Sequence, residues 1–277
     1  MILKPLTGKL GVEIFGADIR NPGDFDLLRG ALADHGVIAV RGQDIGPEDQ
    51  VAFAERFAPI NVNRFFAKLP GHPKVAVVLK EPDQQAAIGE DWHTDHSYDQ
   101  KPAMCSVLHC LECPEVGGDT VFASMNAAYE SLSDGLKTML NGLFAWHSSR
   151  HVFGAATIQY ESRRDGRVGN PQAATQESRH PVVIRHPMSG RPCLYVNPEF
   201  TTHIDGWSVE ESKVLLGYLY EVCQREEFHC RLRYQPGTVV VWDNYATWHK
   251  AINDYQGHRR LMHRVTVEGS LLEPYAA

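Results

Sequence analysis

The sequence reads GEDWHTDHSY at residues 89–98, a stretch that places His93 and Asp95 two positions apart. Successive side chains of a β-strand point to opposite faces, so residues two apart project from the same face. One imidazole and one carboxylate are two of the three ligands of a 2-His-1-carboxylate facial triad, which leaves coordination positions open on non-haem Fe(II). The stretch therefore predicts a metal site on an extended segment, with the third ligand supplied from elsewhere in the chain.

This motif is not specific by itself. With 14 histidines in 277 residues, chance gives about one His-x-Asp match, and a second copy stands at His203-Ile204-Asp205. A facial triad needs a third ligand, usually from a distant strand. The best candidate is His249, which follows the apolar run 239–242 and a polar turn. A histidine at the surface or at the core edge is the alternative for that position.

The charge of the chain limits its partners. The formal net charge is −7 at pH 7, which argues against a general nucleic-acid binder or a binder of anionic membranes. The N-terminal stretch MILKPL lacks the apolar core of a signal peptide, and no run approaches the roughly 18 apolar residues of a membrane span. We therefore expect a cytoplasmic protein without nucleic-acid or membrane partners.

Six cysteines are expected to be reduced thiols in that compartment. Cys110-x-x-Cys113 has the spacing of half a zinc site or of a redox pair. A zinc site would need a second close pair, and Cys223 and Cys230 are too far apart to form one. Buried or incidental thiols are therefore the favoured interpretation.

Short apolar runs bounded by turn residues dominate the chain from residue 104 onward. Residues 9–20 predict short strands with Gly turns, and apolar runs predict further strands at 37–40, 75–78, 104–110, 120–123, 144–147, 181–185, 193–196, 230–234, 238–242 and 260–267. Many short strands at irregular spacing favour a double-sheet jelly roll over a series of βαβ units.

Helical periodicity appears in four places. The predicted helices cover 24–35, a segment opened by Pro47, 126–140 and 209–224. Ser208 and Glu211 form a capping box at the start of the last one. The predicted fold class is thus mixed α+β, with a double-stranded β-helix (jelly-roll) core flanked by helices.

The segment 150–179 is polar and rich in Arg, Gly and Gln. A long irregular insert in a compact domain is usually functional or disordered, so we expect an active-site lid around residues 150–180. No internal repeat or linker separates two cores, and residues 1–277 are expected to form a single domain.

The run 260–267 places Arg260 and Arg264 on one face of a largely apolar strand. Burying an unpaired charge is costly, and the planar guanidinium suits carboxylates. The pair therefore predicts an anion site, with two surface arginines as the alternative. GGDT at 117–120 precedes a strand, where glycines allow close approach and the Thr120 hydroxyl can donate to an anion. An ordinary turn is the alternative there.

Together these stretches resemble the taurine/2,4-dichlorophenoxyacetate dioxygenase family, whose members depend on Fe(II) and 2-oxoglutarate. The resemblance covers nearly the whole chain, from LTG at 6–8 to Val267. The matching stretches are WHTD at 92–95, GGDT at 117–120, LYVN at 194–197, WDN at 242–244 with His249, and the run 260–267. His203 and Asp205 fall outside the metal motif of the family, so the resemblance selects His93 and Asp95.

The resemblance implies a role for each matching residue. His93, Asp95 and His249 hold Fe(II). Arg260, helped by Thr120, binds the distal carboxylate of 2-oxoglutarate, and O2 is the other cosubstrate. The implied substrate-binding residues are Arg264, which faces the acidic group of the substrate in relatives, Phe200, Phe153 and Asn63. We add His96, which follows the metal motif, and His151 in the predicted lid as further pocket candidates.

The implied reaction is hydroxylation of a small anionic substrate, coupled to decarboxylation of 2-oxoglutarate to succinate and CO2. Asn63 and Gly89 stand where taurine-specific relatives have a histidine and an asparagine, which disfavours taurine itself. Segments 89–95 and 147–154 resemble more closely the family members that cleave aryloxyalkanoates. Sulfonates and alkyl sulfates are further candidate substrates. Relatives are often dimers or tetramers, so a homodimer or homotetramer is expected.

Two other classes of protein remain as alternatives. One is a cupin-like isomerase, or a cupin-like protein that binds a metal or ligand without oxygenase activity. Such a protein needs no residues that bind 2-oxoglutarate, so the presence of Arg260 and Thr120 favours the dioxygenase over the cupin-like protein. The other is a zinc hydrolase, for which the sequence offers no evident general base.

Overall fold

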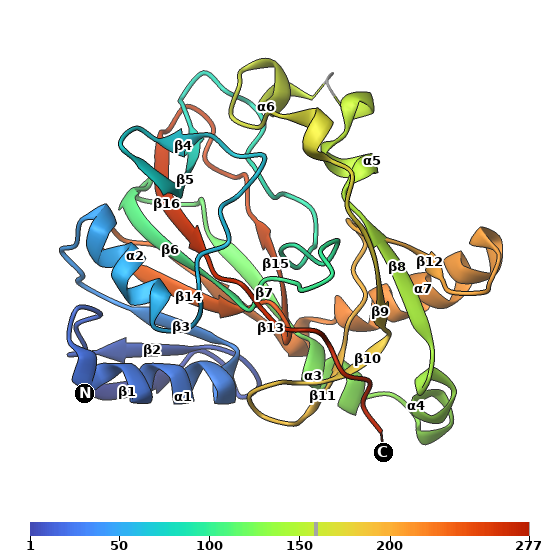
Figure 1. Cartoon of the computed structure of the whole chain (residues 1–277). Coiled ribbons are helices and arrows are strands. Elements are labelled where there is room, and N and C mark those ends of the chain that lie inside the picture. Colours follow the sequence, from blue (N-terminus) through green and yellow to red (C-terminus); the bar gives the residue numbers. More distant parts are fainter. Residues whose placement is uncertain (158–159, 277) are drawn as a thin grey trace.

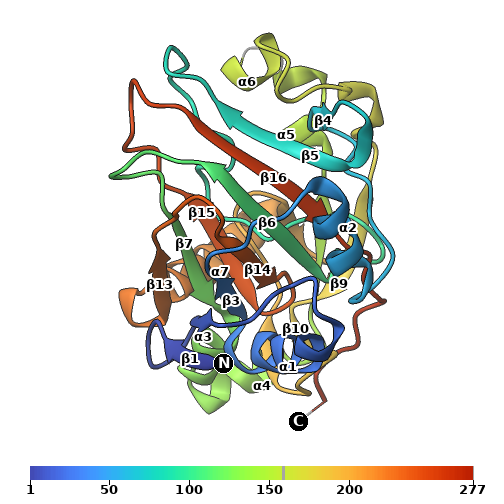
Figure 2. The same ribbon diagram turned by 90° about the vertical axis from the view of Figure 1, so that its left-hand side faces the viewer.

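The computed structural model describes residues 1–157 and 160–276. Its largest sheet is mixed, with β2 and β3 as its parallel pair. From one edge to the other the sheet consists of β1 (Ile2–Pro5), β2 (Val12–Phe15), β3 (Val37–Val40), β14 (Val239–Asp243), β6 (Cys105–Glu112), β16 (Arg260–Thr266), β5 (His72–Lys80) and β4 (Lys68–Leu69). Strands from both ends of the chain are therefore neighbours in its centre (Figures 1 and 2).

Smaller antiparallel sheets complete the β-structure. They are β13 (His229–Leu232), β7 (Thr120–Ser124) and β15 (Thr247–Ala251); β12 (Thr201–Ile204), β8 (Phe144–Ser148) and β9 (Glu177–Pro181); and β10 (Val183–Arg185) with β11 (Pro192–Leu194). The predicted strands overlap these elements, but β1, β4, β12 and β15 were not predicted. His249 lies inside β15 and pairs with Phe122 of β7, whereas we had expected it just after a turn.

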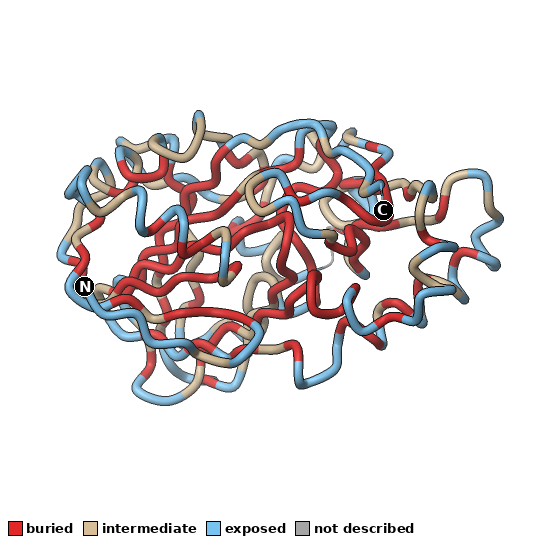
Figure 3. Tube along the Cα trace, turned by 90° about the horizontal axis from the view of Figure 1, so that it is seen from below, coloured by how far each residue is buried: buried red, intermediate tan, exposed pale blue. Residues whose placement is uncertain are grey.

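Strand β14 shows how the two faces of the large sheet are used. Val239 and Val241 pack with α1 (Phe25–His35) and α2 (Pro47–Glu55), while Val240 and Trp242 pack with residues of β7 and β13. A strand buried on both faces reads as a continuous apolar run, as this one does. Figure 3 shows the same contrast, with buried residues along the strands and exposed ones along the outer loops.

The other main helices are α3 (Met125–Glu130), α4 (Asp134–Leu140) and α7 (Val209–Cys223). The prediction of one helix over 126–140 was wrong, because a break at residues 131–133 separates α3 from α4. Ser133 accepts a hydrogen bond from the N–H of Leu136 and so starts a new helix. The capping box of α7 is confirmed: Ser208 accepts from the N–H of Glu211, and Glu211 accepts from the N–H of Ser208.

The segment 150–180, called the lid segment below, contains more structure than the irregular loop that we expected. It contains the short helices α5 (Arg150–Phe153) and α6 (Glu161–Arg164), the 3-10 turns η2 (Ala155–Thr157) and η3 (Pro171–Ala173), and most of β9. Residues 158–159 lie outside the described part. Arg167 joins the segment to the loop 81–90 by donating to the carbonyl of Ala86 (2.9 Å). In Figure 1 α5 and α6 lie at one end of the sheets.

Two further observations concern the predictions about membrane spans and cysteines. Within residues 1–157 and 160–276, no helix is both long enough and apolar enough to cross a bilayer. All six cysteines are free thiols, and Cys113 is the only one of the six that is not fully buried.

Two histidines, His147 and His180, lie in the core with their rings 5.3 Å apart. The Nε2 of His180 is 3.0 Å from the carbonyl oxygen of Asp99, and the Nδ1 of His147 is 3.2 Å from the Ser97 hydroxyl. Burial lowers the pKa of His180 from 6.5 to about 4. Burial, with His180 nearby, lowers the pKa of His147 well below its usual value. Both rings are therefore neutral in the folded protein at pH 7.

This burial predicts a loss of stability in mild acid. The pKa of a histidine in the unfolded chain is about 6.5, whereas the pKa of His180 in the folded protein is about 4. Between pH 6.5 and pH 4 the unfolded chain therefore binds more protons than the folded protein does. Each histidine should then lower the free energy of unfolding by up to about 1.4 kcal/mol per pH unit. Denaturant unfolding of the metal-free protein at pH 7, 6 and 5 measures this slope. His180→Gln should flatten it and the exposed His258→Gln should not; equal stability at pH 7 and 5 would refute the prediction.

Candidate metal centre and its cavity

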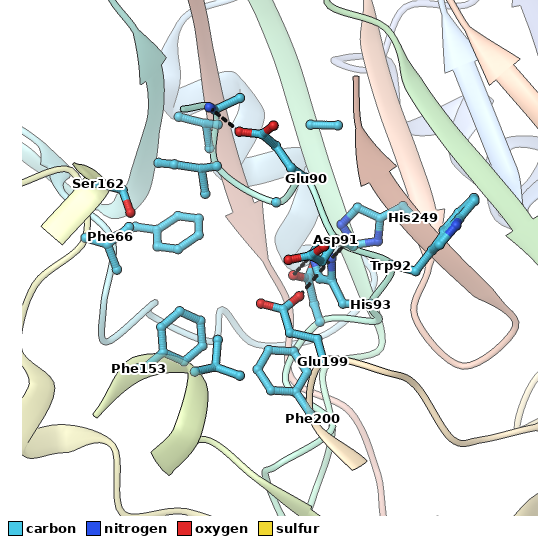
Figure 4. Close-up of a pocket in the computed structure, with 18 of the residues that line it drawn as sticks. Phe66, Glu90, Asp91, Trp92, His93, Phe153, Ser162, Glu199, Phe200 and His249 are labelled. Atoms are coloured by element: carbon cyan, nitrogen blue, oxygen red, sulfur yellow. Dashed lines mark hydrogen bonds and ion pairs between the residues drawn. The ribbon is translucent and has the colours of Figure 1, made fainter. Parts of the chain in front are cut away.

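His93, Asp95 and His249 are buried together, with one possible ligand atom from each lying within 4.8 Å of the others. His93 and His249 form a reciprocal backbone bridge. The N–H of His93 donates to the carbonyl of His249 (3.1 Å), and the N–H of His249 donates to that of His93 (2.8 Å). The two ring centroids are 4.1 Å apart. A bridge between distant segments therefore brings the imidazoles to one point (Figure 4).

The backbone around Asp95 differs from the extended strand that we expected. His93 makes an isolated bridge, and residues 95–98 form a turn in which His96 has a φ of 56°. The Nε2 of His93 is nevertheless 4.0 Å from Oδ1 of Asp95. The two side chains therefore lie close together although the extended segment ends at the turn that begins at Asp95.

The carboxylate of Asp95 is fixed by two donors from the large sheet. The hydroxyl of Ser106 donates to Oδ2 (2.7 Å) and Nη1 of Arg264 donates to Oδ1 (3.1 Å). Burial opposes ionisation, but Arg264 and the nearby imidazoles outweigh it and hold the pKa of Asp95 well below its usual range. The group is therefore an anion at neutral pH, as a metal ligand must be.

The two imidazoles have nitrogens free for a metal. Burial, with His93 nearby, lowers the pKa of His249 far below its usual value, and its buried Nδ1 has no hydrogen-bond partner among the described residues. The Nδ1 of His93 lies 2.8 Å from the carbonyl oxygen of Asp91, while its Nε2 faces Asp95. Neutral imidazoles and one ionised carboxylate fit a divalent transition metal.

The second His-x-Asp pair is half-buried, and its aspartate is bound to other side chains. Asp205 accepts from the indole N–H of Trp146 (2.9 Å) and from Nε of Arg179 (2.7 Å). Within the described residues, the clusters with metal-ligand spacing include neither His203 nor Asp205. Spacing in the sequence could not separate the two pairs, whereas the fold does.

A cavity of about 900 Å³ opens beside the three candidate ligands, and residues of β16 in the large sheet and of β7 and β15 in the smaller one help to line it. Every site residue predicted from the sequence lines it: His93, Asp95, His249, Thr120, Arg260, Arg264, Phe200, Phe153, His96 and Asn63. His151 of the lid segment lines it as well. The fold thus gathers residues that are as far as 201 positions apart, Asn63 and Arg264, around one space.

Arg260 lies in this cavity without a carboxylate at ion-pair distance in the described part of the chain. Its Nε donates to the carbonyl of Gly118 (3.0 Å), and its guanidinium lies 5.0 Å from the ring centroid of Tyr234. Gly118 has a φ of 69°, and a Cβ there would come within 3.3 Å of Arg260. The hydroxyl of Thr120 accepts from that of Tyr234 (3.0 Å). This end of the cavity therefore offers unused guanidinium donors to an anion.

Aromatic side chains form the opposite wall. Phe153 stacks on Phe65 with centroids 4.2 Å apart, and Phe200 lies 5.9 Å from Phe153. His96 also lines the cavity, and its backbone there is left-handed, with a φ of 56°. Its Nε2 is 3.4 Å from the side-chain amide nitrogen of Asn63. The cavity thus joins an apolar wall to a few polar groups, as ligand sites commonly do.

A family model described as "Taurine catabolism dioxygenase TauD, TfdA family" matches residues 3–266. The chain belongs to this family. The resemblance seen in the sequence is thereby confirmed, and the match covers almost all of the described strands and helices.

Individual relatives agree with the family match. The chain is 33% identical over 275 residues to the alkylsulfatase of Acinetobacter baylyi, covering 97% of this chain and 85% of that protein. It is 32% identical over 261 residues to the alpha-ketoglutarate-dependent 2,4-dichlorophenoxyacetate dioxygenase of Cupriavidus pinatubonensis, covering 87% and 88%. The crystal structure of a taurine dioxygenase from Burkholderia xenovorans superposes with a TM-score of 0.81 at 30% identity, covering 99% of this chain and 92% of that one.

Arg264 has a partner that the TauD/TfdA resemblance did not imply. Its guanidinium is paired with Asp95 and lies 4.6 Å from the ring centroid of Phe66. It lines the cavity, but its charge is already shared with a candidate ligand, because Asp95 is anionic and similarly buried. An acidic substrate group would therefore share Arg264 with Asp95.

Sequence reasoning missed two polar groups at this TauD/TfdA site. Ser106, which orients Asp95, was a lone hydroxyl in a buried apolar strand, and that pattern was the available signal. Glu199 lies two residues after the LYVN motif, and its Oε2 is 3.2 Å from Nδ1 of His93. Burial raises the pKa of Glu199. A single acidic residue in a turn gave no sign that it faces the cavity (Figure 4).

Proposed function

We propose that this TauD/TfdA family member is an Fe(II)- and 2-oxoglutarate-dependent dioxygenase. It hydroxylates a small anionic substrate and couples this to decarboxylation of 2-oxoglutarate to succinate and CO2. The observation that supports this best is that one cavity contains both a cluster of two histidines with one aspartate and a buried arginine without a counter-ion. The first suits ferrous iron and the second suits a dicarboxylate.

Each residue has a defined task in this proposal. His93, Asp95 and His249 hold the iron, which with 2-oxoglutarate and O2 supplies the oxidising chemistry when bound. Arg260 and Thr120 bind the distal carboxylate and so orient the cosubstrate. Ser106 and Arg264 hold Asp95 in its ionised form and fixed direction, and outer contacts of this kind tune metal affinity.

The substrate is proposed to be a sulfonate, an alkyl sulfate or an aryloxyalkanoate. The names of the relatives above span these chemical types, and the cavity has both an apolar wall and cationic groups. Phe153 and Phe200 would contact the apolar body of the substrate. Asn63, His96 and Arg264 would contact its polar groups.

A cupin-like protein without oxygenase activity has no observation in its favour. It would not require an unpaired guanidinium at one end of the cavity, nor does it account for the family match over residues 3–266. We also propose that the facing sheets form a double-stranded β-helix and that residues 1–277 act as one domain with 150–180 as its lid. A cytoplasmic homodimer or homotetramer is proposed from the resemblance.

Succinate release tests the reaction class directly. The purified protein with Fe(II), ascorbate, O2 and 2-oxoglutarate should release succinate at least about tenfold faster when its substrate is added, because a bound substrate couples the two half-reactions. A panel of sulfonates, sulfate esters, aryloxy acids and amino acids would be screened. Under anaerobic conditions, Fe(II) and 2-oxoglutarate together should give a visible charge-transfer band. Absence of that band at saturating concentrations would rule out the proposal.

A further inference from the structure

Glu199 places a second carboxylate beside the proposed metal site, and none of the tasks above uses it. The turn that carries it is held by three hydrogen bonds. The Nε2–H of His151, in the lid segment, donates to its carbonyl oxygen (2.6 Å). The side chain of Asn197 accepts from the N–H of Phe200 (2.8 Å), and the Tyr220 hydroxyl donates to the carbonyl of Asn197 (3.0 Å). The turn that presents Glu199 is therefore fixed and in contact with the lid segment.

The carboxylate of Glu199 lacks a donor. Its Oε2 is 3.2 Å from Nδ1 of His93, but the hydrogen on that nitrogen is directed to the carbonyl of Asp91 at 2.8 Å. Oε2 is buried and has no hydrogen-bond partner among the described residues. No lysine or arginine of the described chain is within ion-pair distance of Glu199. Figure 4 shows the carboxylate directed into the cavity, between His93 and the ring of Phe153.

The cationic groups that line the cavity are engaged elsewhere. Arg264 is paired with Asp95, and Arg163 donates to the carbonyls of Val152 (3.0 Å) and Gly169 (3.4 Å). Arg260 is assigned to the distal carboxylate of 2-oxoglutarate. An unpaired carboxylate in a partly desolvated cavity is costly unless a ligand brings a donor. A purely anionic substrate would bring none and would be repelled by it.

We propose that Glu199 determines specificity by accepting a hydrogen bond from a protonated amine of the substrate. The substrate would then be an acid that also has an ammonium group near the carbon that reacts. This inference rests on the proposed function for the metal site and narrows its substrate class. A charge-assisted hydrogen bond of this kind is worth about tenfold to a hundredfold in affinity.

The competing role for Glu199 is to position His93, since carboxylates often bind the outer nitrogen of a ligating histidine. The geometry favours the substrate role, because the Nδ1–H of His93 already donates to the carbonyl oxygen of Asp91. The two roles differ in a measurable way. A positioning residue changes metal affinity, whereas a substrate contact changes the discrimination between ligands.

Matched ligand pairs test the proposal by binding, without turnover. The anaerobic protein loaded with Fe(II) and 2-oxoglutarate would be titrated calorimetrically at pH 7.5 with phenylalanine against 3-phenylpropionate, β-alanine against propionate, and taurine against ethanesulfonate. The wild type should bind the ammonium-bearing member of at least one pair about tenfold or more tightly. Glu199→Gln should remove that preference and keep its Mn(II) affinity within about twofold of wild type.

Glu90→Gln is the matched control. Glu90 also lines the cavity, but its carboxylate accepts from the N–H of Ala87 (2.6 Å) and from the side chain of Asn253 (3.1 Å). It should retain the preference. Equal or weaker binding of every ammonium-bearing member by the wild type, or a preference that survives Glu199→Gln, would overturn the proposal. A tenfold loss of Mn(II) affinity in Glu199→Gln would overturn it in favour of the positioning role. Because binding is measured without O2, a failure of succinate release would count against the proposed reaction alone.

Discussion

Asp95→Ala is expected to abolish metal binding and to destabilise the metal-free protein by about 3–5 kcal/mol. The first effect follows because the carboxylate is one of the three proposed ligands. The second follows because Arg264 would lose its ion-pair partner while only 7% of its side chain is exposed, and removing one member of a buried pair leaves an uncompensated charge. Mn(II) titration monitored by electron paramagnetic resonance and denaturant unfolding of the apoprotein measure the two effects.

Asp205→Ala is the control for this variant, since Asp205 belongs to the other His-x-Asp copy. Its partner Arg179 is exposed at the surface, and pairs of that kind contribute about 0–1 kcal/mol. Metal affinity should be unchanged. Wild-type Mn(II) affinity in Asp95→Ala, or an equal loss in Asp205→Ala, would contradict the assignment of the metal centre.

Arg260→Ala is expected to weaken 2-oxoglutarate binding by about thirtyfold or more, because truncating one partner of a buried charged pair costs about 2–5 kcal/mol. Metal affinity should persist, since Arg260 contacts none of the three ligand residues. Titrating the anaerobic charge-transfer band with 2-oxoglutarate gives the affinity without turnover. Arg260→Lys should recover only part of it, because an ammonium cannot donate in a fork.

Arg259→Ala serves as the neighbouring control. That arginine is bound to Glu81 (3.1 Å) and Glu112 outside the cavity, and its loss should leave the 2-oxoglutarate affinity within about twofold. If Arg260→Ala kept the wild-type affinity, the anchor of the cosubstrate would have to be sought elsewhere in the cavity. The cupin-like alternative would then regain support.

Local sequence signals were reliable where the cause of the structure is local. The capping box of Ser208 and Glu211 starts α7 because both partners lie within one turn. The alternation of Arg260 and Arg264 placed both arginines on the inner face of β16 because strand periodicity is fixed at two. The prediction of one continuous helix over 126–140 was wrong. The apolar periodicity continues across this segment, but Ser133 caps a new helix there and interrupts it.

The sequence by itself determined the order of the elements, the identity of the candidate ligands and the family, because these depend on residue type and spacing. The tertiary structure decided how His93 and Asp95 meet His249, and that Asp95 neutralises Arg264, which is 169 positions away. It also decided that Glu199 faces the cavity. The physical reason is that contacts between distant segments depend on how the sheets and the lid segment pack against each other, and no local pattern of residues encodes that packing.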